Sequence, residues 1–198
     1  MRKFLLLPLL CLPINLYSQT KLEKLIVDEV NAFRTKLCLD SVYYSKDLSK
    51  ATKHHAEWMA KSGIFSHEET KTVPGIKTLR NLQDRFKEYC MRPWNDGTYF
   101  LGSNENIQIC FTSKWDTNKQ GWVKIPLEEL AKNIVKNFED SPGHKENMMY
   151  RVNPRNLRGF IGISVMPTKD DISYVVMSFG GDFKEEYIKQ QAKMYGWD

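Results

Sequence analysis

Histidine, cysteine and excess charge of either sign are scarce in this sequence. Its 198 residues include four histidines and four cysteines, and 29 basic against 24 acidic residues give a net charge of +5. So mild a charge, without a dense basic tract after the first three residues, argues against nucleic-acid binding. No apolar run is long enough to cross a bilayer. The sequence contains 41% hydrophobic and 12% aromatic residues. This composition argues against disorder, and the chain is long enough for one domain with a sizeable core.

The first 19 residues have the layout of a signal peptide. Arg2 and Lys3 precede an apolar run from Phe4 to about Ile14, and the small residue Ser18 follows. We expect cleavage near residues 18–19 and a secreted or periplasmic protein without a transmembrane segment.

The mature chain would keep three cysteines, Cys38, Cys90 and Cys110. In an oxidising compartment Cys90 and Cys110 are the pair to test first, because Cys38 lies near the end of an expected core helix. Three buried thiols are an equally good interpretation. The cysteine spacing does not resemble a zinc knuckle.

Hydrophobic periodicity predicts a mixture of helices and strands. Apolar residues recur at helical spacing in four segments, 21–37, 46–62, 76–90 and 126–138. Alternation or continuous apolar character predicts three strands, 107–111, 159–166 and 173–180, of which the last two suggest a hairpin. The segment between 112 and 122 is polar apart from two tryptophans. This order favours an α+β fold with a small antiparallel sheet between helical layers.

The stretch FEDSPGHKENMM, residues 138–149, combines a helix start with a histidine. Ser141 can cap the helix, with Pro142 first and His144 third. A capping role occupies Ser141 with backbone amides and argues against a Ser–His nucleophilic pair. The helix start disfavours a protonated ring, so His144 should be neutral and able to bind a metal or a hydrogen-bond donor. A purely structural histidine is the alternative.

The partners available to His144 are few. We expect His54 on the surface and His55, which falls on the apolar stripe of its helix, in the core as a hydrogen-bonded residue. His67 lies in the loop after that helix, where functional side chains often occur. Glu105 begins the first predicted strand.

These segments resemble the CAP superfamily, which includes cysteine-rich secretory proteins, antigen 5 and pathogenesis-related protein 1. The likeness covers residues 22–182 and rests on five quoted segments in family order: VNAFRTKLCLDSVYYSKDLSKATKHHAEWMAKSGIFSHEE, NENIQI, FEDSPGHKENMM, GFIGISV and SYVVMSFGG. It implies a three-layer α-β-α sandwich over 20–182, followed by a charged tail at 183–198. It also implies a central cleft in which His67, Glu105 and His144 match the family's cleft residues. The two histidines would bind a divalent cation, and the glutamate would hydrogen-bond nearby.

The sequence departs from the family pattern at three positions. Asn104 replaces the usual glycine before the cleft glutamate, Phe138 replaces a tryptophan, and Ser141 stands where eukaryotic members have a second glutamate. We therefore expect a site of three residues rather than four.

Binding without catalysis is the function that we favour at this point. His67 and His144 would hold Zn²⁺ or another divalent cation weakly, because two protein ligands are fewer than usual. A lipid, a peptide or a cell-surface ligand would occupy the cleft or a neighbouring surface, for which Trp94, Trp115 and Trp122 are candidates.

Two alternatives stay open. In a metal-dependent extracellular hydrolase of peptide or cell-wall material, Glu105 would be the catalytic base that takes a proton from metal-bound water. In a structural protein, the His–Glu–His cluster would only tie a strand to its helices.

Overall fold

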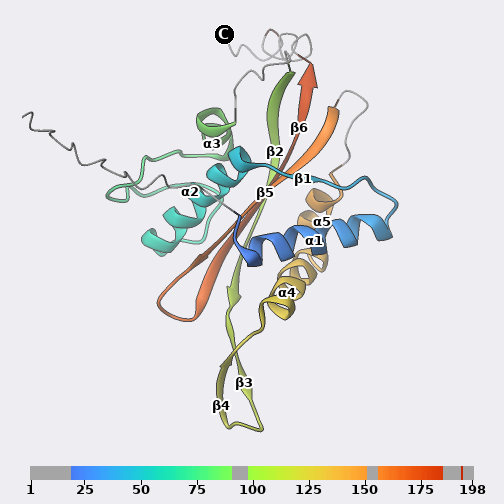
Figure 1. The fold of residues 1–198 in the computed structure, drawn as a ribbon. Helices are drawn as coiled ribbons and strands as arrows, with labels where there is room; N and C mark the ends of the chain where they lie inside the picture. Colours follow the sequence, from blue (N-terminus) through green and yellow to red (C-terminus); the bar gives the residue numbers. More distant parts are fainter. Residues whose placement is uncertain (1–18, 91–97, 151–155, 185–192, 194–198) are drawn as a thin grey trace, which may run out of the picture.

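A computed structural model describes residues 19–90, 98–150, 156–184 and 193 of the chain (Figure 1). The predicted leader, Trp94 and most of the predicted tail lie outside these residues. In the part that the structure describes, no helix is both long enough and apolar enough to span a membrane.

The helices form where the sequence supplies both an apolar stripe and a cap. They are α1 (Lys21–Lys36), α2 (Lys46–Ser62), α3 (Leu82–Tyr89), α4 (Leu127–Glu139) and α5 (Pro142–Met148). A capping box opens α1, in which the Thr20 side chain accepts from the Glu23 amide and the Glu23 carboxylate accepts from the Thr20 amide. Ser45 caps α2, and Gly63 ends it in the left-handed conformation with φ of 71°.

The third helix is shorter than the predicted segment 76–90. It begins at Leu82, where Asn81 and Asp84 form a capping box. The preceding chain makes a turn with a bridge between Val73 and Ile76. The prediction of one continuous helix was therefore wrong at its N-terminal half.

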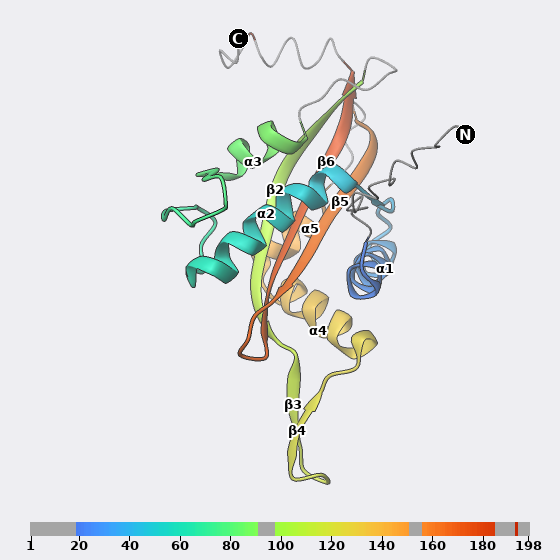
Figure 2. The same ribbon diagram turned by 60° about the vertical axis from the view of Figure 1, so that its left-hand side comes forward.

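A four-stranded sheet separates the helices into two layers. Its order is β1 (Tyr43–Tyr44), β5 (Asn156–Pro167), β6 (Ile172–Lys184) and β2 (Thr98–Phe111). β1 runs parallel to β5, and the other neighbours are antiparallel. Figure 2 shows α2 and α3 on one face of the sheet and α1 and α4 on the other. This confirms the predicted α-β-α sandwich.

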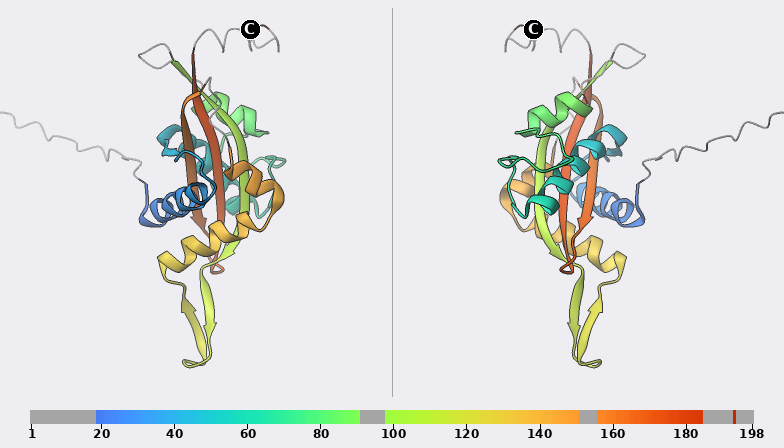
Figure 3. Two further views of the ribbon diagram at one scale, coloured as in Figure 1. Left: turned by 90° about the vertical axis from the view of Figure 1, so that its right-hand side faces the viewer. Right: turned by 90° about the vertical axis from the view of Figure 1, so that its left-hand side faces the viewer.

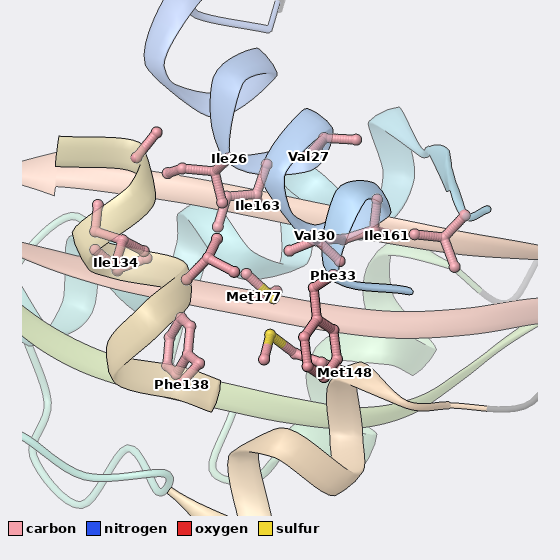
Figure 4. Packing of buried hydrophobic residues seen from close by; sticks show 14 of the residues in the cluster. Ile26, Val27, Val30, Phe33, Ile134, Phe138, Met148, Ile161, Ile163 and Met177 are labelled. Atoms are coloured by element: carbon pink, nitrogen blue, oxygen red, sulfur yellow. The ribbon is translucent and has the colours of Figure 1, made fainter. Parts of the chain in front are cut away.

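The main hydrophobic core lies between the sheet and the layer of α1, α4 and α5 (Figure 4). Its fully buried members include Ile26 and Val30 of α1, Phe138 of α4 and Met177 of β6. A second cluster lies under α2 and includes Trp58. A third cluster includes Leu48 of α2, Phe86 of α3 and Phe160 of β5. The three clusters fix the helices to both faces of one sheet.

The segment predicted as a polar stretch is a two-stranded hairpin, here called the arm (residues 113–124). β3 (Ser113–Asp116) pairs with β4 (Gly121–Lys124), and Trp115 lies opposite Trp122. The arm projects beyond the sandwich in both views of Figure 3.

No disulfide joins the three cysteines of the described chain. Cys90 and Cys110 are buried thiols, so the Cys90–Cys110 pairing is wrong. Cys38 is exposed, so the interpretation as three buried thiols is also wrong for that residue. Burial raises the pKa of the Cys110 thiol to about 11.

Candidate functional site

The predicted residues His67 and Glu105 lie in contact. Nδ1 of His67, in the loop after α2, is 3.1 Å from Oε1 of Glu105 on β2. The glutamate is buried, whereas 55% of the His67 side chain is exposed. The Glu105 carboxylate therefore lies inside the protein, and the His67 imidazole is in contact with solvent.

A buried arginine holds the Glu105 carboxylate from the other side. Nη2 of Arg85 donates to both Glu105 oxygens, at 2.9 and 3.0 Å, and to the carbonyl of His67 at 3.2 Å. Burial alone would raise the pKa of Glu105, but the hydrogen bond from His67 and the charge of Arg85 outweigh it and lower that pKa. Glu105 is therefore an ionised acceptor, and Nδ1 of His67 must carry the shared proton. Nε2 of His67 takes no part in this bond.

A second carboxylate, Glu69, lies beneath the first. Its oxygens accept from Nδ1 of His55 at 3.2 Å, from the Leu79 amide at 2.8 Å and from Nε2 of His54 at 3.4 Å. Burial opposes ionisation, but the hydrogen bonds from the two histidines prevail and lower the pKa of Glu69 to about 2. Glu69 is thus a buried anion in the same loop as His67, two residues further along the chain.

His55 lies between two acceptor groups. Its Nε2 lies 2.8 Å from the carbonyl of Ser66, while its Nδ1 faces the Glu69 carboxylate. Arg85, which lies 2.9 Å from Glu105 and 3.7 Å from Glu69, is the buried cation next to both carboxylates. The prediction that His55 is a hydrogen-bonded core residue is confirmed.

His54 is buried as well, which contradicts its predicted place on the surface. Its Nε2 faces Glu69, and its Nδ1 lies 3.0 Å from the hydroxyl of Tyr89, which can donate to it. Packing of α3 against α2 covers this side of the helix, which helical spacing alone does not show.

His144 approaches the same strand from the opposite layer. It is the third residue of α5, after Ser141 as N-cap and Pro142, as predicted. The Ser141 side chain makes no capping hydrogen bond, so that part of the expectation fails. The His144 ring packs edge-on against Phe138 at a centroid distance of 5.3 Å. Burial and the charge of His67 lower the pKa of His144, which keeps its ring neutral.

Two asparagines fasten α5 to the strand that carries Glu105. Asn106 donates to the carbonyl of His144 at 2.9 Å, and Asn147 donates to the carbonyl of Glu105 at 3.2 Å. Asn147 also donates to the Asn106 side chain at 2.7 Å. Together with Arg85 and Glu69, these residues shape the site, and sequence reasoning did not identify them.

The three predicted residues are thus brought to one part of the fold, with His67 and Glu105 in direct contact. Among the described residues, no group of three or more His, Cys, Asp or Glu side chains is arranged to hold a metal ion. Any cation here would rely on the two histidines and on water.

The sequence matches the model of the cysteine-rich secretory protein family, CAP, over residues 27–179. The chain belongs to the CAP family. No curated protein shows a significant sequence match to it.

Three solved structures are similar to this chain. An outer surface protein from Borrelia burgdorferi superposes with a TM-score of 0.52 at 20% identity, over 83% of this chain and 95% of the other. An extracellular SCP-domain protein from Bacillus anthracis gives a TM-score of 0.48 at 16% identity, over 81% and 39%. A cysteine-rich secretory protein from Staphylococcus aureus gives 0.44 at 12% identity, over 82% and 40%. At these identities the first likeness supports the fold alone.

The low pKa of Glu69 predicts that this CAP domain loses stability in acid. Its folded-state pKa of about 2 lies below the ordinary 4.5, so its contribution is complete above about pH 4.5 and disappears as the pH falls towards 2. We expect a loss of about 3 kcal/mol of unfolding free energy across this range. Urea unfolding at several pH values would measure it. Glu69→Gln should flatten the profile, whereas Glu68→Gln, at an exposed neighbour, should leave it unchanged.

Proposed function

We propose that this protein is an exported CAP-domain binding protein that holds a divalent cation, zinc by preference, between His67 and His144. The observation that carries the proposal is the bond between Nδ1 of His67 and ionised Glu105. A histidine that donates one ring N–H to a carboxylate presents its other nitrogen as a more basic and better oriented metal ligand. Arg85 keeps that carboxylate ionised and fixed.

The state of His144 supports the same proposal. A metal ligand must be the neutral imidazole, and the lowered pKa of His144 favours this form at neutral pH. Two imidazoles suit zinc, whose remaining positions would be filled by water or by a ligand oxygen.

The second ligand and the location are further parts of the proposal. A cation with open positions would accept the carboxylate or carbonyl of a peptide, or the headgroup of a small lipid-like molecule. Export is supported by the leader-like first 19 residues and by the likeness to an outer surface protein.

Two hollows on the described surface lie away from the site. One lies between α2 and the β5–β6 turn, and the other lies between α1 and α4.

The hydrolase alternative finds less support in the same geometry. A general base works best with a pKa near the operating pH. Arg85 occupies both oxygens of Glu105, and the pKa of Glu105 is lowered. Glu105 is therefore better suited to position His67 than to accept a proton.

The test is zinc titration of the mature chain by calorimetry, with thermal melts in parallel. We expect saturable weak binding and a higher Tm with zinc, and we expect His67→Ala and His144→Ala each to weaken binding by tenfold or more. His54→Asn, which alters a buried structural histidine, should lower stability but leave zinc affinity unchanged. Zinc binding that survives both alanine variants, or is absent in the wild type, would refute the proposal. Loss of stability alone would support a structural cluster instead.

A further inference from the structure

The arm carries an exposed tryptophan pair that the cation site does not explain. Trp115 and Trp122 lie directly opposite each other on β3 and β4, with ring centroids 6.0 Å apart and planes at 82°. Their exposed fractions are 54% and 70%. Such a cross-strand contact stabilises a hairpin, but here it leaves more than half of each indole in water. By contrast, Trp58 of the body is fully buried.

The base of the arm is fixed to the body by several polar contacts. Asp171, in the β5–β6 turn, accepts from the Ser113 hydroxyl at 3.2 Å and from the Lys124 ammonium, and its carbonyl accepts from the Thr112 amide at 2.9 Å. Lys114 donates to Glu129 of α4 at 2.6 Å. The Thr112 backbone bond and the Ser113 contact, which do not depend on the exposed ion pairs, orient the base of the arm and lower the ordering cost of any contact made by its aromatic face.

The turn at the tip is also built into the arm. The Asp116 carboxylate accepts from the backbone amides of Asn118 and Lys119, at 2.9 and 3.2 Å. Gln120 completes the turn with φ of 47°. The only acidic side chain of the arm is thus occupied by its own turn.

Shape and charge together indicate the kind of partner. Soluble small ligands bind in concave sites, whereas the arm projects from the sandwich (Figures 1 and 3). A projecting aromatic pair can enter a lipid headgroup layer, which would surround both rings. Tryptophan is favoured in such a layer because it lies between the apolar bilayer interior and water. The arm sequence contains three lysines, Lys114, Lys119 and Lys124, against Asp116 alone. The ion pairs of Lys114 with Glu129 and of Lys124 with Asp171 are solvent-exposed and therefore weak.

We infer that the arm is a membrane-docking element, which inserts Trp115 and Trp122 into the headgroup layer of a bilayer that carries anionic lipids. Lys119 at the tip of the arm contacts the lipid phosphates, while Lys124 at its base adds to the positive charge of the arm. Phe111, which is 69% exposed just before the arm, extends the apolar surface towards the body. The docked protein keeps its cation site on the sandwich, away from the tip of the arm.

The test is sedimentation of the full mature chain with phosphatidylcholine vesicles, with and without phosphatidylglycerol. We expect binding to the anionic vesicles that falls with added salt and weakens about tenfold or more in Trp115→Ala/Trp122→Ala. Lys119→Glu should weaken it about fivefold or more without removing an aromatic ring. Phe65→Ala, at an exposed aromatic residue of the body, is the matched control and should bind like the wild type.

Insertion itself is measured by quenching of tryptophan fluorescence with brominated lipid. Trp115→Phe/Trp122→Phe keeps an aromatic pair across the hairpin, so the arm stays folded, and this variant should lose most of the quenching. Equal vesicle binding by the wild type and the double alanine variant would overturn the inference. So would an absence of binding to both kinds of vesicle, which would direct the search to a protein pocket that receives the arm.

Discussion

Replacing Arg85 with leucine is expected to lower the free energy of unfolding by about 3–5 kcal/mol. The guanidinium is fully buried and lies between two carboxylates, bonded to Glu105 at 2.9 Å and 3.7 Å from Glu69. Leucine would leave both buried anions without this cation, and removal of one member of a buried charge network costs much more than the network contributes net. Urea unfolding of the mature chain at neutral pH, followed by circular dichroism, would measure the loss.

Lys77→Leu is the matched control for this prediction. It removes a cation that is also paired, with Glu88 at 2.7 Å, but whose side chain is 63% exposed, and we expect a loss below about 1 kcal/mol. Adding Glu105→Gln to Arg85→Leu should recover part of the stability, because it removes one unpaired charge. If Arg85→Leu costs no more than Lys77→Leu, the described network does not stabilise the fold.

The fold could be predicted from hydrophobic spacing wherever a helix buries one continuous stripe. Ile26, Val30 and Phe33 of α1 form such a stripe. The start of α3 could not be predicted in this way, because Leu79 is buried as part of an extended segment. Its amide donates to the Glu69 carboxylate and the carbonyl of Arg80 accepts from the Glu69 amide, so both groups are held by a distant residue rather than by a helix.

The resemblance to a family predicted His67, Glu105 and His144, which no local pattern could have joined. Arg85 and Glu69 were missed because charged side chains are normally solvated, and Arg80 nearby is indeed exposed. One signal was present in the sequence. Arg85 shares a helical face with Leu82, Phe86 and Tyr89, and an arginine on an apolar face needs a buried anion.

The arm was not predicted, for a different reason. Each of its strands has four residues, which is too short for alternation to stand out from a polar stretch. Its position depends on Asp171, which lies far along the chain and forms contacts that the arm sequence cannot reveal.

Gly162→Ala is expected to cost about 3 kcal/mol or more, at the upper end of the range for overpacking. Gly162 of β5 pairs with Ser178 of β6, which in turn pairs with Glu105 of β2. These three residues form a row across the sheet, and Gly162 is the member that lies against α2. A methyl group at Gly162 would lie 2.5 Å from the backbone carbon of Leu48 and 2.7 Å from the amide nitrogen of Ser49. Backbone atoms cannot rotate away, so the whole helix must move.

That movement links stability to the site. Ser49 of α2 accepts from the Ile163 amide at 3.2 Å, and the same helix carries His55 to Glu69. We therefore expect Gly162→Ala to weaken zinc binding as well as to lower Tm. Gly143→Ala is the matched control, because a methyl group there meets no atom within 4 Å and the position is helical. It lies next to His144 and should leave Tm unchanged or slightly raised. A Gly162→Ala protein with wild-type Tm and wild-type zinc affinity would show that neither the position of α2 nor the site depends on this glycine.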